Sequence, residues 1–295
     1  MTTVDQAIHT YLSAVALSRS PNTSRTYRNA MNAFRRALLL RGLDPAKAPV
    51  GQIQEDMISG FADHLKAYAP ASERLYLTAV AGWFDHLAAE RMAEVNLPRL
   101  RLLIRRRARR PGIRLPQFPE TAIERVLEYA GTLDRAPAPD RRTSLLNLRD
   151  RAFLLTLGDT GLRVHEACRL RRGDLDMNEG RAVLIGKGDR QAVVRFSQRA
   201  LRALRSYLSA RAAHDGASGR PLSALPVFAR HDPAAGEKTL PISTTTGRSI
   251  VHARVAEALG PDEVGTITPH SFRHYFVTTV LRGSGGNLKL AQELA

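Results

Sequence analysis

The sequence contains very little cysteine and no long apolar run, and both absences narrow the class of protein. Cys168 is the only cysteine among 295 residues, which excludes an intramolecular disulfide and a cysteine-rich zinc site. No histidine pair has cysteine partners at zinc-site spacing, so we expect no structural zinc. No stretch approaches the roughly 18 apolar residues of a membrane-spanning helix. The start, MTTVDQAIHT, lacks the features of a secretory signal, and we expect a cytoplasmic protein that does not enter a membrane.

Lysine is also scarce, although the chain is strongly basic. The 44 basic and 28 acidic residues give a net charge of +16 and an isoelectric point near 11.0. Only five of the basic residues are lysine, and the 39 arginines carry the planar guanidinium that binds phosphate bidentately. This balance favours a polyanionic partner, although a GC-rich genome would also enrich arginine. The 43% hydrophobic and 24% charged content is typical of a folded protein and excludes a disordered basic tail protein.

The length and one basic segment predict two domains. Residues 100–110, LRLLIRRRARR, carry six arginines, and Pro111, Gly112 and Pro116 follow. This pattern predicts a linker over 100–118 between a domain at 1–99 and a domain at 119–295. The chain has 17 basic and 9 acidic residues before Pro111, and 27 and 19 from there on, so each part carries +8. Both parts should therefore face the polyanion, with a merely solvated linker as the alternative for the basic run.

Apolar residues recur at helical spacing before the linker, without strand-like alternation. Breakers divide this part into helices over about 4–17, 23–40, 52–68 and 72–91, which predicts a small four-helix bundle. The last helix places its core on Leu75, Val80, Trp83, Phe84 and Leu87. Trp83 and Phe84 should therefore pack in the core and not stack on bases.

The second part is predicted to combine helices with one β-hairpin. Arg181–Ile185 and Ala192–Phe196 are β-rich runs joined by GKGDRQ, in which Gly186 and Gly188 bracket Lys187. Helices are expected over 119–129, 145–157, 197–211, 246–259 and 272–281. The predicted fold class is mainly α with a small β-sheet.

Three constellations outside the first domain point to phosphodiester chemistry. Arg163 lies at a glycine-bearing helix start, with Glu166 three residues on to brace it. His270 and Arg273 are three residues apart and share a face if helical, and Lys187 lies at the hairpin tip. Fixed guanidinium groups can stabilise charge on the non-bridging oxygens, while histidine and lysine can move protons. Each residue alone has a plainer explanation: His270 as a core histidine, Lys187 as a surface lysine, and Cys168 simply as core.

The ordered set TGLRVHEACRL, GKG and TPHSFRHYFVT resembles the tyrosine recombinases, also called phage integrases, which include the Xer- and Cre-type enzymes. The resemblance covers nearly the whole chain. It implies an N-terminal SAM-like four-helix core-binding domain and an α+β catalytic domain that clamp duplex DNA together. It also implies that Arg163 and Arg273 hold the scissile phosphate, that Lys187 is the general acid, that His270 assists proton transfer, and that Glu166 supports them. The family works without cofactor, through a phosphotyrosine intermediate, and as a homotetramer on DNA.

The chain departs from the family pattern at its C-terminal end. In the family a Leu-Gly-His segment and then the nucleophilic tyrosine follow the H-x-x-R motif, whereas the sequence here ends at NLKLAQELA. We therefore expect a chain truncated before the nucleophile, able to bind DNA without cleaving it. Tyr275 is a poor substitute, because on a helix it would point away from the face of His270 and Arg273.

Two other functions remain open from the sequence. One is a non-catalytic DNA-binding regulator on a recombinase scaffold, and the other is a basic RNA-binding protein, although no RNP-like strand pair or KH-type loop is present. The residues expected to contact DNA are basic side chains of the second helix and the linker: Arg25, Arg28, Arg35, Arg105, Arg106, Arg107, Arg109 and Arg110.

Overall fold

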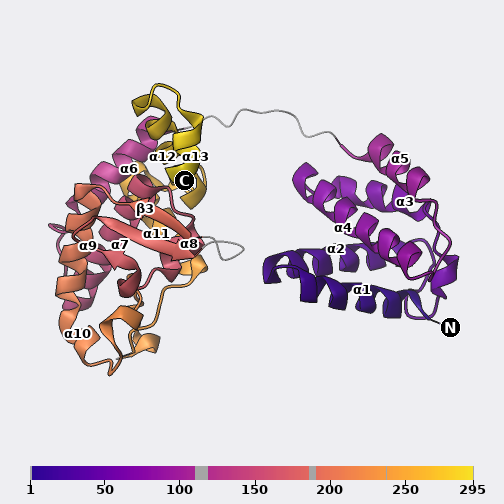
Figure 1. The fold of residues 1–295 in the computed structure, drawn as a ribbon, viewed down its shortest axis with the longest axis horizontal. Coiled ribbons are helices and arrows are strands. Elements are labelled where there is room, and N and C mark those ends of the chain that lie inside the picture. Colours follow the sequence, from indigo (N-terminus) through magenta and orange to yellow (C-terminus); the bar gives the residue numbers. More distant parts are fainter. Residues whose placement is uncertain (1, 110–118, 186–190, 237, 295) are drawn as a thin grey trace. The chain divides into compact units, whose positions relative to one another are not determined.

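The chain forms two compact units, Met1–Leu115 and Pro116–Ala295 (Figure 1). Each unit has its own hydrophobic core. The computed structural model describes residues 2–109, 119–185, 191–236 and 238–294. No helix in these ranges is long and apolar enough to cross a membrane.

The described part of the N-terminal unit is built from helices. The start of the second helix follows directly from the sequence: the Ser20 hydroxyl accepts the backbone N–H of Thr23, and Pro21 occupies the first helical position. The predicted helix over 52–68 is instead a shorter α-helix flanked by two 3-10 turns. The elements are α1 (Val4–Ser18), α2 (Pro21–Leu39), η1 (Val50–Gln52), α3 (Met57–His64), η2 (Leu65–Ala67), α4 (Pro70–Ala89) and α5 (Leu97–Arg107).

The basic segment is a helix over most of its length, so its interpretation as a linker from residue 100 onward was wrong. Asn96 caps α5 by accepting the backbone N–H of Arg99. Leu100 is 1% exposed, and Leu103 and Ile104 pack against the same core. These three residues form one helical face among the arginines, and it packs α5 against α3 and α4.

Aromatic rings fill the core of the N-terminal unit. Phe34 lies edge-to-face with Phe61 and Trp83, with ring centroids 5.2 and 5.5 Å apart. Trp83 and Phe84 are fully buried, which confirms that they pack in the core. Leu75, in contrast, is 45% exposed, so its prediction as a core residue was wrong.

The C-terminal unit is mainly helical with one small antiparallel sheet, as predicted. Its sheet has the order β1-β2-β3, and β1 was not foreseen from the sequence. The α-helices and strands are α6 (Glu120–Thr132), α7 (Arg141–Thr160), α8 (Val164–Arg169), β1 (Leu175–Asp176), β2 (Arg181–Ile185), β3 (Gln191–Arg195), α9 (Gln198–Ala210), α10 (Ala212–Gly216), α11 (Thr244–Leu259), α12 (Pro269–Gly283) and α13 (Leu288–Leu294). Short 3-10 turns are η3 (Arg172–Asp174), η4 (Leu222–Ala224), η5 (Pro233–Ala235) and η6 (Pro261–Glu263).

The predicted β-hairpin is present as the pair β2 and β3. Its register runs from Arg181 opposite Arg195 to Ile185 opposite Gln191. Lys187, at the connection between the strands, lies outside the described residues.

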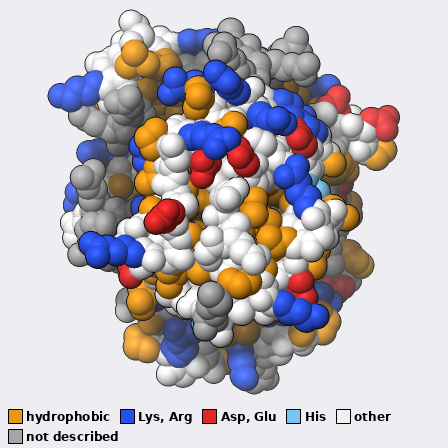
Figure 2. Space-filling view, turned by 90° about the vertical axis from the view of Figure 1, so that its right-hand side faces the viewer, with side chains coloured by type: hydrophobic (Ala, Val, Ile, Leu, Met, Phe, Trp, Pro, Cys, Tyr) orange, Lys and Arg blue, Asp and Glu red, His pale blue; other side chains and the backbone are white. Residues whose placement is uncertain are grey.

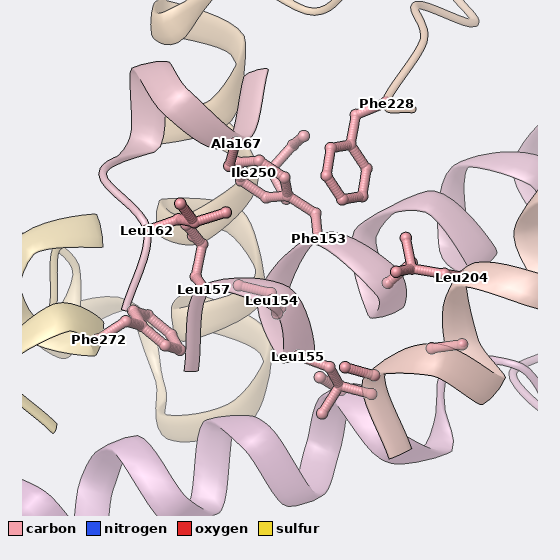
Figure 3. Packing of buried hydrophobic residues seen from close by; sticks show 14 of the residues in the cluster. Phe153, Leu154, Leu155, Leu157, Leu162, Ala167, Leu204, Phe228, Ile250 and Phe272 are labelled. Carbon is pink, nitrogen blue, oxygen red and sulfur yellow. The ribbon is translucent and has the colours of Figure 1, made fainter. Parts of the chain in front are cut away.

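Helix α7 is the centre of this unit, with α6, α8, α9 and α12 packed against it. Phe153 on α7 meets Phe228 edge-to-face at 5.1 Å, and Leu154 and Leu157 belong to the same buried cluster (Figure 3). Helix α8 approaches α11 closely at Gly247, where an added Cβ would lie 3.0 Å from the Sγ of Cys168. Cys168 is 3% exposed and part of this core, as expected.

Candidate functional site

Arg163 is positioned by the sharp junction between α7 and α8. Helix α7 ends at Gly161, whose φ of 64° lies in the left-handed region that favours glycine. Leu162 then turns into the core with 3% exposure, and Arg163 takes the N-cap position of α8. The chain reversal thus buries Leu162 and leaves the next side chain, Arg163, 53% exposed.

Glu166 holds Arg163 in place as the sequence predicted. One carboxylate oxygen accepts the backbone N–H of Arg163 at 2.8 Å, and the other accepts a guanidinium N–H at 3.0 Å. The guanidinium is therefore oriented by the first turn of its own helix.

Arg273 reaches the same junction from α12. That helix begins with a capping box between Thr268 and Ser271 and with Pro269 at its first position. The buried Phe272 ties α12 to the core. Arg273 donates from Nη1 to the carbonyl of Gly161 at 2.7 Å, so one of its N–H groups fixes the side chain beside Arg163.

A cavity of about 300 Å³ lies between these residues. Three of the predicted site residues, Arg163, His270 and Arg273, therefore converge from segments more than 100 positions apart. Arg248 and His252 on α11 were not foreseen; their spacing of four residues places both on one helical face and was the signal available in the sequence. The complete lining is Arg163, Val164, Arg248, His252, Thr268, Pro269, His270 and Arg273.

The ionisable groups of the cavity favour an anionic ligand. Burial, the His274 ring and the charges of Arg273 and Arg163 lower the pKa of His270, so this imidazole is neutral at pH 7. Its ring lies 4.4 Å from that of His274. Burial and Arg163 also lower the pKa of Arg273, against the opposing effect of Glu166. Arginine remains charged nonetheless, and no carboxylate is among the described residues that line the cavity.

The charge of the arrangement suits an anionic group such as a phosphate. Three guanidinium groups offer N–H donors, two of them oriented by hydrogen bonds to Glu166 and to the Gly161 carbonyl, and neutral His270 can accept a proton or donate one hydrogen bond. Within the described part of the chain, no group of three or more His, Cys, Asp or Glu residues is placed to hold a metal ion.

Tyr275 lies away from the cavity, as predicted. It packs against the hydrophobic core, and burial and the charge of Glu124 raise its pKa, while Arg199 lowers it. These neighbours belong to α6 and α9, on a different side of α12 from the His270 and Arg273 face.

Several arginines expected to contact DNA already have partners inside the N-terminal unit. Arg35 donates to Asp5 at 2.6 Å, and Arg107 pairs with Asp63 at 2.9 Å. Arg25 donates to the Asn22 side chain at 2.8 Å. On the face drawn in Figure 2, basic side chains lie beside acidic ones, as such pairs require.

Arg109 is the most strongly engaged of this set. Its guanidinium donates to the carboxylate of Glu73 and to the carbonyls of Leu65 and Tyr68. Burial alone would raise the pKa of Glu73, which is 1% exposed, but hydrogen bonds from Lys66 and Arg109 lower it to about 2. The remaining expected contacts are Arg28, Arg105 and Arg106, which are exposed and without an ionic partner among the described residues, and Arg110, which lies outside them.

Comparisons with known proteins identify the family of this chain. Residues 124–295 match the sequence profile of the Phage integrase family. Tyrosine recombinase XerD of Chlorobaculum tepidum is 30% identical over 296 residues, which cover 98% of this chain and 87% of the relative. Tyrosine recombinase XerC of Mycobacterium sp. strain KMS is 34% identical over 175 residues, 59% of this chain; the match spans only about half, 53%, of that relative's length.

A solved structure shares the fold. The crystal structure of the XerH site-specific recombinase, bound to its difH substrate in a pre-cleavage complex, superposes with a TM-score of 0.66. The match covers 99% of this chain and 77% of the other at 18% identity.

Proposed function

Because the chain belongs to the phage integrase family, we propose that it is a site-specific tyrosine recombinase that acts on duplex DNA. The observation that carries the proposal is the convergence of Arg163, Arg273 and His270 on one cavity. The relatives include the tyrosine recombinase XerD, and XerH was solved bound to its difH substrate. On DNA the chain would act as a two-unit clamp and assemble as a homotetramer, as the family resemblance implies.

In this proposal the cavity holds the scissile phosphate. Attack on a phosphodiester increases the negative charge on the non-bridging oxygens, where the guanidinium groups of Arg163 and Arg273 would bind them. The loss of one such donor costs about 2.7–4 kcal/mol of transition-state stabilisation in related chemistry. Neutral His270 would take or relay the proton of the attacking hydroxyl, and Lys187 would protonate the departing sugar oxygen, each contributing roughly 10²–10⁴-fold.

The 295 residues alone would bind DNA without cleaving it. Tyr275 is the last tyrosine of the sequence, and no tyrosine is among the described residues that line the cavity. The nucleophile that forms the phosphotyrosine intermediate would therefore have to come from outside these residues.

The direct test is the affinity for a labelled duplex as a function of salt. Each phosphate that the protein neutralises contributes about −0.9 to the slope of log Kobs against log salt. A clamp predicts a steep slope and a preference for duplex DNA over structured RNA in competition. A flat salt dependence, or a preference for RNA, would refute the proposal.

A further inference from the structure

A second basic cavity of about 570 Å³ lies where α8 ends and α11 begins, beside the two helices that also line the first cavity. The first cavity is lined by Arg163 at the start of α8 and by Arg248 and His252 on α11. The second is lined by Arg169 at the end of α8 and by Ser243 and Thr244 at the start of α11. Helices α8 and α11 thus pack so that both cavities lie along one seam.

Three arginines line this second cavity without an acidic partner among the described side chains: Arg169, Arg171 and Arg220. Arg171 meets a carboxylate only through its backbone N–H, which donates to Asp174 at 2.8 Å. Arg220 donates from its side chain to the carbonyl of Ala224 at 3.4 Å. The adjacent Arg172, in contrast, is neutralised by the buried Asp215 at 2.6 Å.

Backbone pairing gives the cavity a fixed frame. Arg171 and Pro226 form an isolated antiparallel bridge, with Arg172 N–H donating to the Leu225 carbonyl at 2.9 Å and Val227 N–H to the Leu170 carbonyl at 2.8 Å. The N-terminus of α11 also faces the cavity, since Thr244 lines it, and the partial positive charge there favours an anion.

We propose that this second cavity binds a backbone phosphate of the same DNA strand that enters the first cavity. The six residues from Arg163 to Arg169 rise about 9 Å along an α-helix. This length is comparable to the separation of neighbouring phosphates on one strand, so the second phosphate would lie within a few nucleotides of the reacting one. The two cavities adjoin at α11: Arg248 lines the first, and the neighbouring Gly247 closely approaches Cys168, which lines the second. This inference rests on the proposed function, because it requires DNA in the first cavity.

The experiment compares three triple variants with the native chain in the salt-dependent binding assay. The test variant is Arg169→Gln, Arg171→Gln and Arg220→Gln. The matched control is Arg135→Gln, Arg141→Gln and Arg202→Gln; these arginines of the same unit are exposed and line neither cavity. A third variant replaces the three cavity arginines with lysine, which keeps the charge and excludes a folding defect as the explanation.

The proposal predicts that the test variant loses about 0.9 from the magnitude of the slope for each phosphate released. The control should keep the native slope, and the lysine variant should recover it. Equal slopes for the test variant, the control and the native chain would overturn the second phosphate site while leaving the proposed function intact. An equal reduction in test and control variants would also overturn it, since the effect would then be one of general charge. A flat slope for the native chain would overturn the proposed function itself.

Discussion

At the residue scale, Gly161 is the position on which the candidate site depends most. Its carbonyl accepts from Arg273, its left-handed backbone ends α7, and Arg163 follows two residues later. A Cβ at this position would also lie 2.4 Å from the ring of Phe276. One glycine therefore couples Arg163 and Arg273 to the helix that carries the core.

Replacing Gly161 with alanine should destabilise the C-terminal unit by about 2–4 kcal/mol, from left-handed strain and overpacking together. The measurement is urea unfolding followed by far-UV circular dichroism. Gly131→Ala is the control. Nothing lies within 4 Å of an added Cβ there, and alanine is more favourable than glycine inside a helix such as α6. Similar unfolding free energies for the two variants would show that Gly161 is not structurally required.

His231 makes the stability of the C-terminal unit dependent on pH. Its Nε2 lies 2.8 Å from the Tyr207 hydroxyl, and burial and the charges of Arg149 and Arg211 lower its pKa to about 3. The unfolded histidine has a pKa of about 6.5, so the unfolded state binds the proton first as the pH falls. Stability present above pH 6.5 is therefore lost as the pH falls from about 6.5 towards 3.

Urea unfolding between pH 6.5 and 5 checks this dependence. The free energy of unfolding should fall by at most about 1.4 kcal/mol per pH unit, and by less because solvent screens the partly exposed ring. His231→Gln keeps a hydrogen-bonding side chain and should flatten the profile. His165→Gln, at an exposed position of the same unit, should leave it as in the native chain. An unchanged profile in His231→Gln would assign the pH dependence to other groups.

At the scale of elements, α5 makes the basic segment part of the N-terminal unit. Leu100→Ala should destabilise this unit by about 2–5 kcal/mol, because it leaves a cavity beneath the helix. Leu102, 42% exposed on the same helix, is the control and should cost little when replaced with alanine. Trp83 is the only tryptophan of the sequence and is fully buried in this unit, so its fluorescence reports this transition alone. Equal, small effects of the two substitutions would contradict the packing of α5.

The elements that the sequence predicted well are those with a strong local signal. Ser20 and Pro21 mark the start of α2, and the β-branched runs around Lys187 indicate the hairpin. Helix α5 was missed because the many arginines in its sequence obscure the helical spacing of its apolar residues, Leu100, Leu103 and Ile104. Burial of that face depends on α3 and α4, which no local pattern specifies.

The candidate site likewise contains residues that the sequence predicted and residues that it did not. Arg163, His270 and Arg273 were predicted because they belong to recognisable sequence motifs. The structure brings them to one cavity. Arg248 and His252 belong to no such motif. They lie on α11, which approaches α8 closely at Gly247, and a contact between segments so far apart along the chain cannot be predicted from a local pattern.

At the scale of the whole molecule, we expect DNA binding without DNA cleavage. The 295-residue chain should shift a labelled duplex on a native gel yet leave no protein attached to DNA under denaturing conditions, since no tyrosine is among the described lining residues. Tyr275→Phe should behave identically, because Tyr275 packs against the core. An adduct that disappears in Tyr275→Phe would overturn both the site and the placement of the nucleophile.

Arg163→Ala and Arg273→Ala should leave most of the DNA affinity in place, with a loss of at most about 0.9 from the slope in each case. The net charge of +16 is spread over both parts of the sequence, so many other cations remain to hold the backbone. Salt titrations of the two variants check this expectation. A collapse of binding in either variant, with its fold intact by circular dichroism, would mean that the cavity dominates affinity.

The burial of Cys168 between α8 and α11 also affects how readily the protein is oxidised. Burial raises the pKa of this thiol to about 11, against the effect of Arg248, so almost no thiolate is present at neutral pH. It is the only cysteine of the sequence and is 3% exposed, so no exposed thiol is available to link two copies of this chain. The folded chain should therefore resist oxidants and bind DNA equally well with and without a reducing agent.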